Sequence, residues 1–435
     1  MIEKEIPMPD KTVLVGIVKK GESAQALDSS LDELEGLLKT AGGECFARLT
    51  QSKEAPDPRT MIGSGKAAEL AYLCACNDVT LVVFDCELSP SQIRNLEAIM
   101  GDKVRVIDRS MLILDIFALH AVTGEGKLQV ELAQLKYTAP RLMGRGTELS
   151  KLGGGIGTRG PGETQLETDR RHLQRRIRAL EDQIEEIAKN RKTMRAARDR
   201  SGIPTVAIVG YTNAGKSTLL NHLTDAGILA EDKLFATLDP TTRKFELPCG
   251  ETVLLTDTVG FIKKLPHHLV SAFHSTLEEA ACADILLIII DASDPEFAEQ
   301  VEVTETLLEE LGASGKPTLY VFNKCDRGMA QISTVGVAAS RDDTVYISAL
   351  TGQGVDRLVE RLEALVTDGK RRITYFIPNK DAGALNDLYR LATVESVDYG
   401  ADGMRVVALA DARARGTMKR FAVDDIPEPK EDWEE

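Results

Sequence analysis

The sequence predicts an α/β protein built from several domains, and three observations support this fold class. Apolar runs that are typical of strands alternate with helical patterns in the first 108 residues and again from residue 201 to about 368. A Gly-x-x-x-x-Gly-Lys-Ser pattern occupies residues 210–217, between one such run and one such helix, as a phosphate-binding loop (P-loop) requires. Between the two α/β regions, apolar side chains recur every seven residues, which indicates a long amphipathic helix.

A chain of 435 residues exceeds one ordinary domain, so its length predicts three or four, and we divide it into four. They are an N-terminal α/β domain over residues 1–108, a helical hairpin with a glycine-rich loop over 109–200, a P-loop domain over 201–368 and a small α+β domain over 369–435. In the last domain the pattern predicts a strand, a helix and two strands, followed by an acidic tail from Asp424 to Glu435.

The composition restricts the class of protein. The formal net charge is −15, so any contact with nucleic acid must come from a local basic patch. The seven cysteines are scattered, and we interpret Cys74 and Cys76 as buried thiols rather than metal ligands. The N-terminus has no signal-peptide pattern, and the longest apolar run, around residues 285–290, is too short to span a bilayer. We therefore expect a reduced, soluble, cytoplasmic protein without a membrane span, and a monomer.

The first 108 residues predict a small sheet whose strands are mainly parallel, because strands and helices alternate. The expected strands span residues 12–18, 45–49, 80–84 and 104–107, and the expected helices span 24–40, 66–76 and 89–100. Residues 63–66, Gly-Ser-Gly-Lys, resemble a second phosphate loop. However, Thr60 replaces its first glycine and Ala67 follows the lysine, so a structural or RNA-facing turn is favoured.

The region after residue 108 predicts a helical hairpin. A helical pattern from Arg109 to about Ala139 leads into a glycine-rich loop from Arg141 to Gly162, and loops of this length are usually functional or disordered. The following helix carries a seven-residue repeat and should pack antiparallel to the first helix. The repeat is formed by Leu166, Leu173, Leu180, Ile187 and Met194, with Ile177 and Ile184 between them.

Residues 141–200 are basic in an otherwise acidic chain, with 15 Lys+Arg and 9 Asp+Glu, a local charge of 15 − 9 = +6. One interpretation is a solvated coiled-coil face. The other is an RNA-facing hairpin in which the candidate contacts Arg145, Lys151 and Arg159 neutralise phosphates. Composition does not choose between these two interpretations.

The P-loop predicts a triphosphate site with a magnesium ion. Backbone N–H groups of the loop wrap the phosphates, Lys216 reaches the β- and γ-phosphates, and Ser217 binds Mg²⁺. Asp257, at the end of an expected strand, can hold the outer shell of the ion, and the Gly260 N–H can meet the γ-phosphate. A threonine should complete the magnesium sphere. Both Thr237 and Thr241 qualify, and spacing favours Thr237.

The sequence Asn323-Lys324-Cys325-Asp326 predicts which base is bound. The Asp326 carboxylate can accept hydrogen bonds from the ring N–H and the amine of guanine, whereas adenine offers no such pair. Asn323 would brace the loop, the stem of Lys324 would cover the base, and the Ala349 N–H could meet the guanine oxygen. We therefore expect GTP and GDP as ligands.

The expected nucleotide contacts form four groups along the chain. They are Gly210, Tyr211, Thr212, Asn213, Ala214, Gly215, Lys216, Ser217 and Thr218; Phe235, Ala236, Thr237, Leu238 and Asp239; Asp257, Thr258, Val259 and Gly260; and Asn323, Lys324, Asp326, Ser348, Ala349 and Leu350. Lys216 and Gly260 are the candidate catalytic residues among them.

The residue after Gly260 predicts slow hydrolysis. Many small GTPases carry a water-orienting glutamine at this position, but here it is Phe261, whose side chain has no donor or acceptor. Asn213 resembles the asparagine of GTPases that bind a potassium ion beside the phosphates, so potassium is a candidate second cofactor. We expect slow intrinsic hydrolysis that a partner stimulates.

The chain resembles the HflX family of GTPases over roughly residues 11–368. The resemblance rests on the glycine-rich stretch from Leu152 to Arg171, on residues 61–66 and on residues 235–241. It implies a GTPase that binds the large ribosomal subunit and acts in ribosome splitting or rescue under stress, with a loop-tipped hairpin that reaches ribosomal RNA. The family's nucleotide motifs match Lys216, Ser217, Thr237, Asp257, Gly260, Asn323 and Asp326.

Two alternatives from other classes stay open. The first is an RNA-remodelling NTPase that also uses ATP through its N-terminal region, and ATP turnover that survives loss of Lys216 would favour it. The second is a binding module with a silent nucleotide site, although no expected nucleotide-binding residue is missing.

Overall fold

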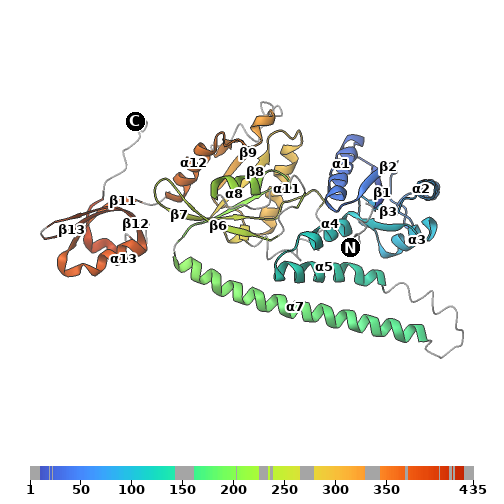
Figure 1. Cartoon of the computed structure of the whole chain (residues 1–435), viewed down its shortest axis with the longest axis horizontal. Helices are drawn as coiled ribbons and strands as arrows, with labels where there is room; N and C mark the ends of the chain where they lie inside the picture. The colour runs from blue at the N-terminus through green and yellow to red at the C-terminus, as the bar shows by residue number, and fades with distance from the viewer. Residues whose placement is uncertain are drawn as a thin grey trace, which may run out of the picture.

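The structure is a computed structural model that arranges the chain as a row of folded parts along a long helix (Figure 1). It describes residues 10–18, 20–21, 23–142, 161–201, 203–224, 234–235, 239–264, 279–328, 343–367, 371–400, 402–410, 414 and 417–425. None of the helices in these ranges is both long and apolar enough to cross a membrane.

The N-terminal part is a four-stranded sheet in the order β2-β1-β3-β4, and all its strand pairs are parallel, as predicted. Its elements are β1 (Lys11–Val18), α1 (Ala24–Thr40), β2 (Glu44–Ser52), α2 (Ser64–Cys76), β3 (Leu81–Phe84), α3 (Pro90–Met100) and β4 (Arg105–Asp108). The hydroxyl of Ser23 accepts a hydrogen bond from the Ala26 N–H and fixes the start of α1.

Two details of this part differ from, or refine, the prediction. Cys74 is buried but Cys76 is exposed, because residues two apart on a helix point in different directions. The expectation of two buried thiols was therefore wrong for Cys76. Gly63 precedes α2, its N–H donates to the Gln51 side chain at 2.8 Å, and Lys66 forms an ion pair with Glu69 at 3.0 Å. These contacts favour a structural turn.

The helical pattern that follows β4 forms two helices, α4 (Arg109–His120) and α5 (Gly124–Leu142), where the sequence predicted one. Ala121 has extended backbone angles and ends α4. The N–H groups of Val122 and Thr123 then donate to the Asp239 carboxylate at 2.9 and 2.8 Å, and a new helix begins. The break thus depends on a residue that lies far along the chain.

The long helix α7 (Pro161–Ser201) runs back alongside α5 in the opposite direction, so the predicted antiparallel hairpin is present (Figure 1). Arg176 pairs with Glu131 at 2.7 Å, and Lys136 pairs with Glu181 at 2.7 Å, across the two helices. Within the described part of the seam, Leu180 is buried, and the other apolar positions are partly buried. Those positions are Leu173, Ile177, Ile184 and Ile187.

The P-loop part is a six-stranded sheet in the order β10-β9-β8-β5-β7-β6. Its elements are β5 (Thr205–Gly210), α8 (Lys216–Thr224), β6 (Thr241–Glu246), β7 (Thr252–Asp257), β8 (Ile285–Asp291), α11 (Phe297–Glu310), β9 (Thr318–Asn323), the short 3-10 helix η2 (Cys325–Arg327), β10 (Thr344–Tyr346) and α12 (Val355–Thr367). The strands are parallel except β6, which pairs antiparallel with β7. The sequence did not predict β6.

The C-terminal part is an antiparallel sheet in the order β12-β13-β11-β14, with α13 against it. Its elements are β11 (Arg371–Pro378), the 3-10 helix η4 (Asn379–Asp381), α13 (Gly383–Leu391), β12 (Ala392–Tyr399), β13 (Gly403–Ala410), the 3-10 helix η5 (Lys419–Phe421) and β14 (Ala422–Asp425). The prediction of three strands missed β14. The last two residues of β14, Asp424 and Asp425, are the first two of the stretch expected to be an acidic tail. Residues 426–435 lie outside the described part.

Candidate nucleotide-binding site

The P-loop connects β5 to α8, as the motif predicted. Gly215 has φ +100°, and a Cβ at this position would overlap the side-chain nitrogen of Asn323. Lys216 is buried, and its ammonium donates to the backbone oxygens of Gly210 at 3.1 Å and Tyr211 at 2.9 Å. The lysine is therefore held folded over its own loop.

Burial changes the acid–base behaviour of Lys216. Its surroundings together lower the pKa of the Lys216 ammonium to about 8. Burial is the largest cause and lowers the pKa, the charge of Asp257 raises it, and the charge of Lys324 lowers it. A phosphate beside Lys216 would favour the charged form, so a bound nucleotide should raise this pKa.

Ser217 and Asp257 meet below the loop. The Ser217 hydroxyl donates to an Asp257 carboxylate oxygen at 2.6 Å, and Asp257 is fully buried at the end of β7. A hydroxyl and a carboxylate are the hard oxygen ligands that Mg²⁺ prefers, so this donor set fits the ion. Within the described ranges, no group of three His, Cys, Asp or Glu could hold a metal alone. An ion here would need oxygen ligands from the phosphates as well.

The two threonine candidates for the magnesium sphere have different outcomes. Thr241 begins β6 and pairs with Asp257 across the sheet, so it stays close to the candidate metal residues. Thr237, with its neighbours Ala236 and Leu238, lies outside the described residues. The choice between Thr237 and Thr241 stays a prediction.

The Asp257-x-x-Gly260 segment is joined to the P-loop by backbone hydrogen bonds. The Phe261 N–H donates to the Gly210 oxygen at 3.1 Å, and the Thr212 N–H donates to the Phe261 oxygen at 2.8 Å. Phe261 is 1% exposed and packs in the hydrophobic core. Its ring thus faces protein rather than a reacting water.

Asn323 connects three of the predicted motifs. Its amide nitrogen donates to the Ala214 oxygen at 2.8 Å, and its side-chain oxygen accepts from the Ala349 N–H at 2.8 Å. Asn323 therefore braces both the P-loop and the loop around Ser348, as the sequence predicted for a bracing residue. The Ala349 N–H, expected to meet guanine, is engaged by Asn323 in this structure.

The other residues expected to specify the base lie near Asn323, at the carboxyl end of β9. The Ser348 hydroxyl donates to Asp326 at 2.6 Å, which fixes the carboxylate expected to read guanine. Lys324 adopts a left-handed backbone conformation (φ +62°), and its ammonium pairs with Asp291 at 2.7 Å. Leu350 is 74% exposed.

Two residues expected to contact nucleotide, Phe235 and Asp239, also contact the parts that precede the P-loop, and their expected nucleotide contacts stay a prediction. Phe235 is buried, and its ring packs edge-on against Phe117 of α4, with centroids 4.8 Å apart. Asp239 accepts hydrogen bonds from the N–H groups of Val122 and Thr123, just before α5, and from the Thr123 hydroxyl. The segment between P-loop and β6 is thus attached to the hairpin.

A buried polar network between the N-terminal sheet and the P-loop was not predicted. The Tyr211 hydroxyl donates to Glu33 of α1 and accepts from the Lys263 N–H at 2.6 Å. Arg109 donates to Glu33, and also to Asp85 at 2.8 Å. No local sequence pattern could reveal it, because Glu33 and Tyr211 are 178 positions apart.

The network changes the pKa of its members. Burial, followed by the charge of Glu33, raises the pKa of the Tyr211 hydroxyl. Burial opposes the charge of Arg109, but Glu33 and Asp85 outweigh it and raise the guanidinium pKa. Lys264 adds a second cation, which pairs with Asp85 at 2.6 Å.

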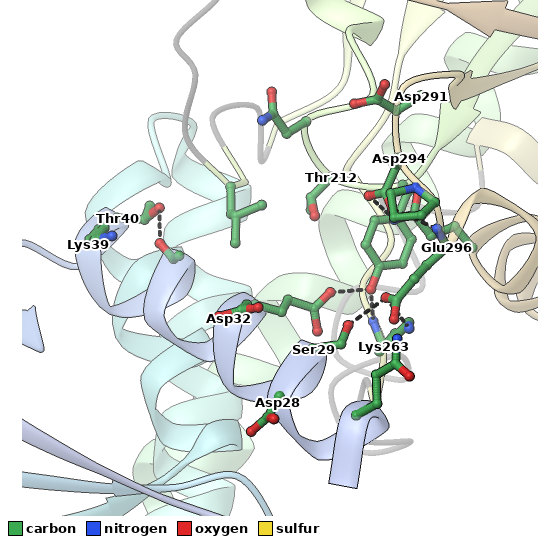
Figure 2. A pocket seen from close by; sticks show the side chains of 18 residues that line it. Asp28, Ser29, Asp32, Lys39, Thr40, Thr212, Lys263, Asp291, Asp294 and Glu296 are labelled. Carbon is green, nitrogen blue, oxygen red and sulfur yellow. Dashed lines mark hydrogen bonds and ion pairs between the residues drawn. The ribbon is translucent and has the colours of Figure 1, made fainter. Parts of the chain in front are cut away.

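A cavity of about 1010 Å³ separates α1 from the P-loop. Figure 2 shows Asp28 and Asp32 on one side and Asp291, Asp294 and Glu296 on the other. Thr212 and Asn213 of the P-loop also line it. The cavity therefore joins the expected phosphate site to an acidic wall of the N-terminal part.

Comparisons with known proteins agree with this geometry. Residues 28–118 match the profile of the family "GTP-binding GTPase N-terminal", residues 120–198 match "GTP-binding GTPase Middle Region" and residues 205–324 match "50S ribosome-binding GTPase". The chain is 49% identical over 404 residues to GTPase HflX of Lacrimispora saccharolytica, covering 93% of this chain and 94% of the relative. The chain belongs to the HflX family of GTPases.

Two further proteins are similar to the chain. GTPase HflX of Escherichia coli K12 is 45% identical over 379 residues, which cover 86% of this chain and 87% of that protein. A solved structure of a GTP-binding protein of Sulfolobus solfataricus in complex with GDP is 26% identical, with a TM-score of 0.44, and covers 82% of this chain and 99% of that one.

Family membership establishes the activity of the P-loop part. This HflX-family protein binds GTP and hydrolyses it to GDP and phosphate. The basic candidates Arg145, Lys151 and Arg159 lie outside the described residues. The arginines and lysines that the structure does describe on α7 pair in part with α5, as Arg176 and Arg191 do with Glu131 and Glu125.

Proposed function

We propose that this HflX-family GTPase acts in the cytoplasm as a monomer that associates with the large ribosomal subunit, in ribosome splitting or rescue under stress. Two observations support the partner. The profile matched by residues 205–324 is described as a 50S ribosome-binding GTPase. Residues 141–200 carry a charge of 15 − 9 = +6 in a chain of −15, as a contact to RNA phosphates would require.

The observation that carries the switch is the contact of Asp239 with Val122 and Thr123, the two residues just before α5. Asp239 belongs to the segment between Ser217 and Asp257, where the triphosphate should recruit a threonine to the magnesium ion. Asp239 holds Thr123, whose hydroxyl caps α5, so a movement of Asp239 would disturb that cap. Helix α5 is one of the two hairpin helices. Nucleotide state and hairpin are therefore mechanically connected, as a GTP-controlled ribosome factor needs.

Hydrolysis rests on the positions of a few groups. Lys216 and the loop N–H groups would hold the phosphates, and the Gly260 N–H would donate to the γ-phosphate. Ser217 and Asp257 would hold Mg²⁺, which neutralises charge on the β- and γ-phosphates when bound. Asn213 is the candidate for a potassium ion beside them.

We propose that intrinsic hydrolysis is slow and that the large subunit stimulates it. Phe261 is buried and apolar, so it cannot orient water as glutamine does. A group or a rearrangement supplied by the partner would have to complete the site. Potassium beside Asn213 could add positive charge at the developing negative charge.

Cosedimentation tests the partner directly. The full chain is mixed with large or small ribosomal subunits in the presence of GDP or a non-hydrolysable GTP analogue. We expect tight binding to the large subunit with the analogue and weaker binding with GDP. Equal binding with both nucleotides would contradict a switch, and no binding would remove the ribosomal partner.

Single-turnover hydrolysis tests the rate proposal. It is measured with and without large subunits, in potassium and then in sodium. We expect strong stimulation by the subunits and a faster reaction in potassium. Fast turnover by the isolated protein with no subunit effect would overturn the partner-completed site, and ATP turnover that survives Lys216→Ala would favour the RNA-remodelling alternative.

A further inference from the structure

Thr212 of the P-loop has a buried hydroxyl that the protein does not use. The residue is 6% exposed, and its Oγ1 has no hydrogen-bond partner among the residues that the structure describes. Buried hydroxyls are normally hydrogen-bonded, and leaving one without a partner is unfavourable. This hydroxyl is therefore a candidate for contact with a ligand.

The position of Thr212 is fixed by backbone and packing. Its N–H donates to the Phe261 oxygen at 2.8 Å. A Cβ built on Gly260 would lie 2.7 Å from the Thr212 methyl carbon and 2.9 Å from the Lys216 ammonium nitrogen. The side chains of Thr212 and Lys216 thus meet at Gly260, the residue whose N–H is expected at the γ-phosphate.

The side chain of Thr212 borders a cavity, while its hydroxyl oxygen itself is buried. Thr212 lines the cavity of about 1010 Å³ between the P-loop and α1, and Figure 2 shows its side chain directed into that cavity. Its methyl packs toward Gly260, so the oxygen takes another direction. A small polar group in this corner could reach it.

Three neighbouring hydroxyls are already committed to protein partners. Ser217 donates to Asp257 at 2.6 Å, and Thr258 donates to the Ile208 oxygen at 2.8 Å. Tyr211 donates to Glu33. Phe261, at the position of the usual glutamine, offers no polar atom. Within the part of the chain that the structure describes, Thr212 differs from these three neighbours because its buried hydroxyl has no protein partner.

We propose that Thr212 is a further catalytic residue. Its hydroxyl donates a hydrogen bond to the γ-phosphate of GTP and accepts one from the attacking water. The inference rests on the proposed placement of the γ-phosphate beside Lys216 and Gly260. In the reaction, the water oxygen bonds to the γ-phosphorus and the bond to the bridging oxygen breaks, with its electron pair leaving on GDP. The water proton ends on the phosphate product, and Thr212 is unchanged.

Thr212→Val tests the proposal because it removes the hydroxyl and keeps the shape. We expect single-turnover hydrolysis to fall by about 100-fold, as for loss of one transition-state hydrogen bond, with the affinity for fluorescent GDP changed less than about threefold. Thr212→Ser keeps the hydroxyl and should stay within about threefold of the wild-type rate. Thr304→Val is the matched control, since it also removes a buried threonine hydroxyl, one that donates to the Gln300 oxygen at 2.8 Å in α11.

Three results would overturn the proposal. Thr212→Val could hydrolyse GTP within about threefold of the wild-type rate. It could also lose GDP binding to the same degree as hydrolysis, and that result would indicate a structural role. Thr212→Ser could be as slow as Thr212→Val, which would assign the effect to the methyl contact with Gly260. The rates are compared with and without large subunits. A wild type that the subunits fail to stimulate would contradict the ribosomal proposal, while the ratio of variant to wild type would still test Thr212.

Discussion

Thr123 is held at the start of α5 by Asp239, a residue of the P-loop part. The Thr123 N–H donates to one Asp239 oxygen at 2.8 Å, and the Thr123 hydroxyl donates to the other. A helix leaves its first N–H groups without partners inside the helix, and here the Thr123 hydroxyl accepts from one of them, the Gly126 N–H, at 3.0 Å. The residue that caps α5 is therefore held in place by a carboxylate from the segment between Ser217 and Asp257.

Asp239→Ala should uncouple α5 from the nucleotide. The variant loses the carboxylate that holds Thr123, the residue whose hydroxyl caps α5. Loss of a cap costs about 1 kcal/mol, and a loosened cap should let the first turn of α5 exchange its amide hydrogens faster. In the wild type we expect this exchange to differ between GDP and a non-hydrolysable GTP analogue, and in the variant we expect fast exchange with both. Mass-spectrometric hydrogen exchange over residues 124–142 measures this.

Ser23→Ala is the control for Asp239→Ala, because it removes the cap of α1, a hydrogen bond of 3.0 Å from the Ala26 N–H. It should loosen α1 and leave the nucleotide dependence of α5 intact. An Asp239→Ala variant that keeps the nucleotide dependence of α5 would show that the signal does not pass through this cap.

Replacing Arg145, Lys151 and Arg159 with Ala should weaken binding to the large subunit and leave GTP affinity intact. If these side chains contact phosphates, the slope of log affinity against log salt should fall by about 2 to 3. Cosedimentation across a salt series measures the slope. Replacing Lys20, Arg372 and Arg390 removes the same charge from exposed positions elsewhere and should have little effect. If both triple variants bind the large subunit equally weakly, the effect comes from net charge and not from these three positions.

Asp326→Asn should move the preference from GTP to xanthosine triphosphate. The carboxylate is held by the Ser348 hydroxyl at 2.6 Å, and an amide in its place can donate to the extra carbonyl of xanthine. A hydrogen bond to a charged group contributes about 1.5–3 kcal/mol, so GTP affinity should fall by about 10- to 100-fold. Competition binding with the two triphosphates tests it, with Asp343→Asn, an exposed partner of Arg361, as control. A variant that still prefers GTP would exclude Asp326 as the base reader.

Local patterns predicted most of the fold. The helix expected over residues 24–40 is α1 with the same bounds, because the leucines of its buried face and the Ser23 cap are both encoded within the segment. The strand β6 was missed, since its residues Thr-Thr-Arg-Lys-Phe-Glu carry little apolar character and its place at the sheet edge is set by pairing with β7. The break between α4 and α5 was missed for a related reason, because the distant Asp239 holds the two residues at the break, Val122 and Thr123.

The site was predictable where a motif defines its own geometry. Three predicted motifs meet at the carboxyl ends of the sheet strands. They are the Gly210–Ser217 loop, Asp257 and the loop from Asn323 to Asp326. Phe235 and Asp239 were placed at the nucleotide, but their described contacts are with α4 and α5. A motif states which residues occur together and does not state which distant element they contact.

Tyr211→Phe should weaken the contact between the P-loop and the N-terminal sheet. It removes the hydroxyl that donates to Glu33 and accepts from the Lys263 N–H at 2.6 Å, and leaving these groups without their partner costs about 1–3 kcal/mol. We expect a lower midpoint of urea unfolding for the N-terminal part. Tyr320→Phe is the matched control, since its hydroxyl donates to Glu305 at 2.6 Å within the P-loop part. If both variants unfold the N-terminal part alike, the Tyr211 contact does not join the two parts.

The affinity for GDP should fall as the pH rises above 8, because Lys216 must be charged to hold phosphate. Burial lowers the pKa of Lys216 in the free protein to about 8, and a bound phosphate raises it. The affinity is therefore fully present below pH 8. Above pH 8 binding must take up a proton, so the dissociation constant should rise by up to about tenfold per pH unit.

The measurement is GDP binding between pH 7 and 9 in buffers of different ionisation enthalpy, so that calorimetry also counts the protons taken up. We expect no uptake near pH 7 and an uptake that approaches one proton at pH 9. Lys263→Ala serves as a control at a second partly buried lysine, and its variant should keep the same pH profile. The dissociation constant could instead stay flat over this range, with no proton uptake. Lys216 would then keep its charge in the free loop, and burial would not lower its pKa as the structure indicates.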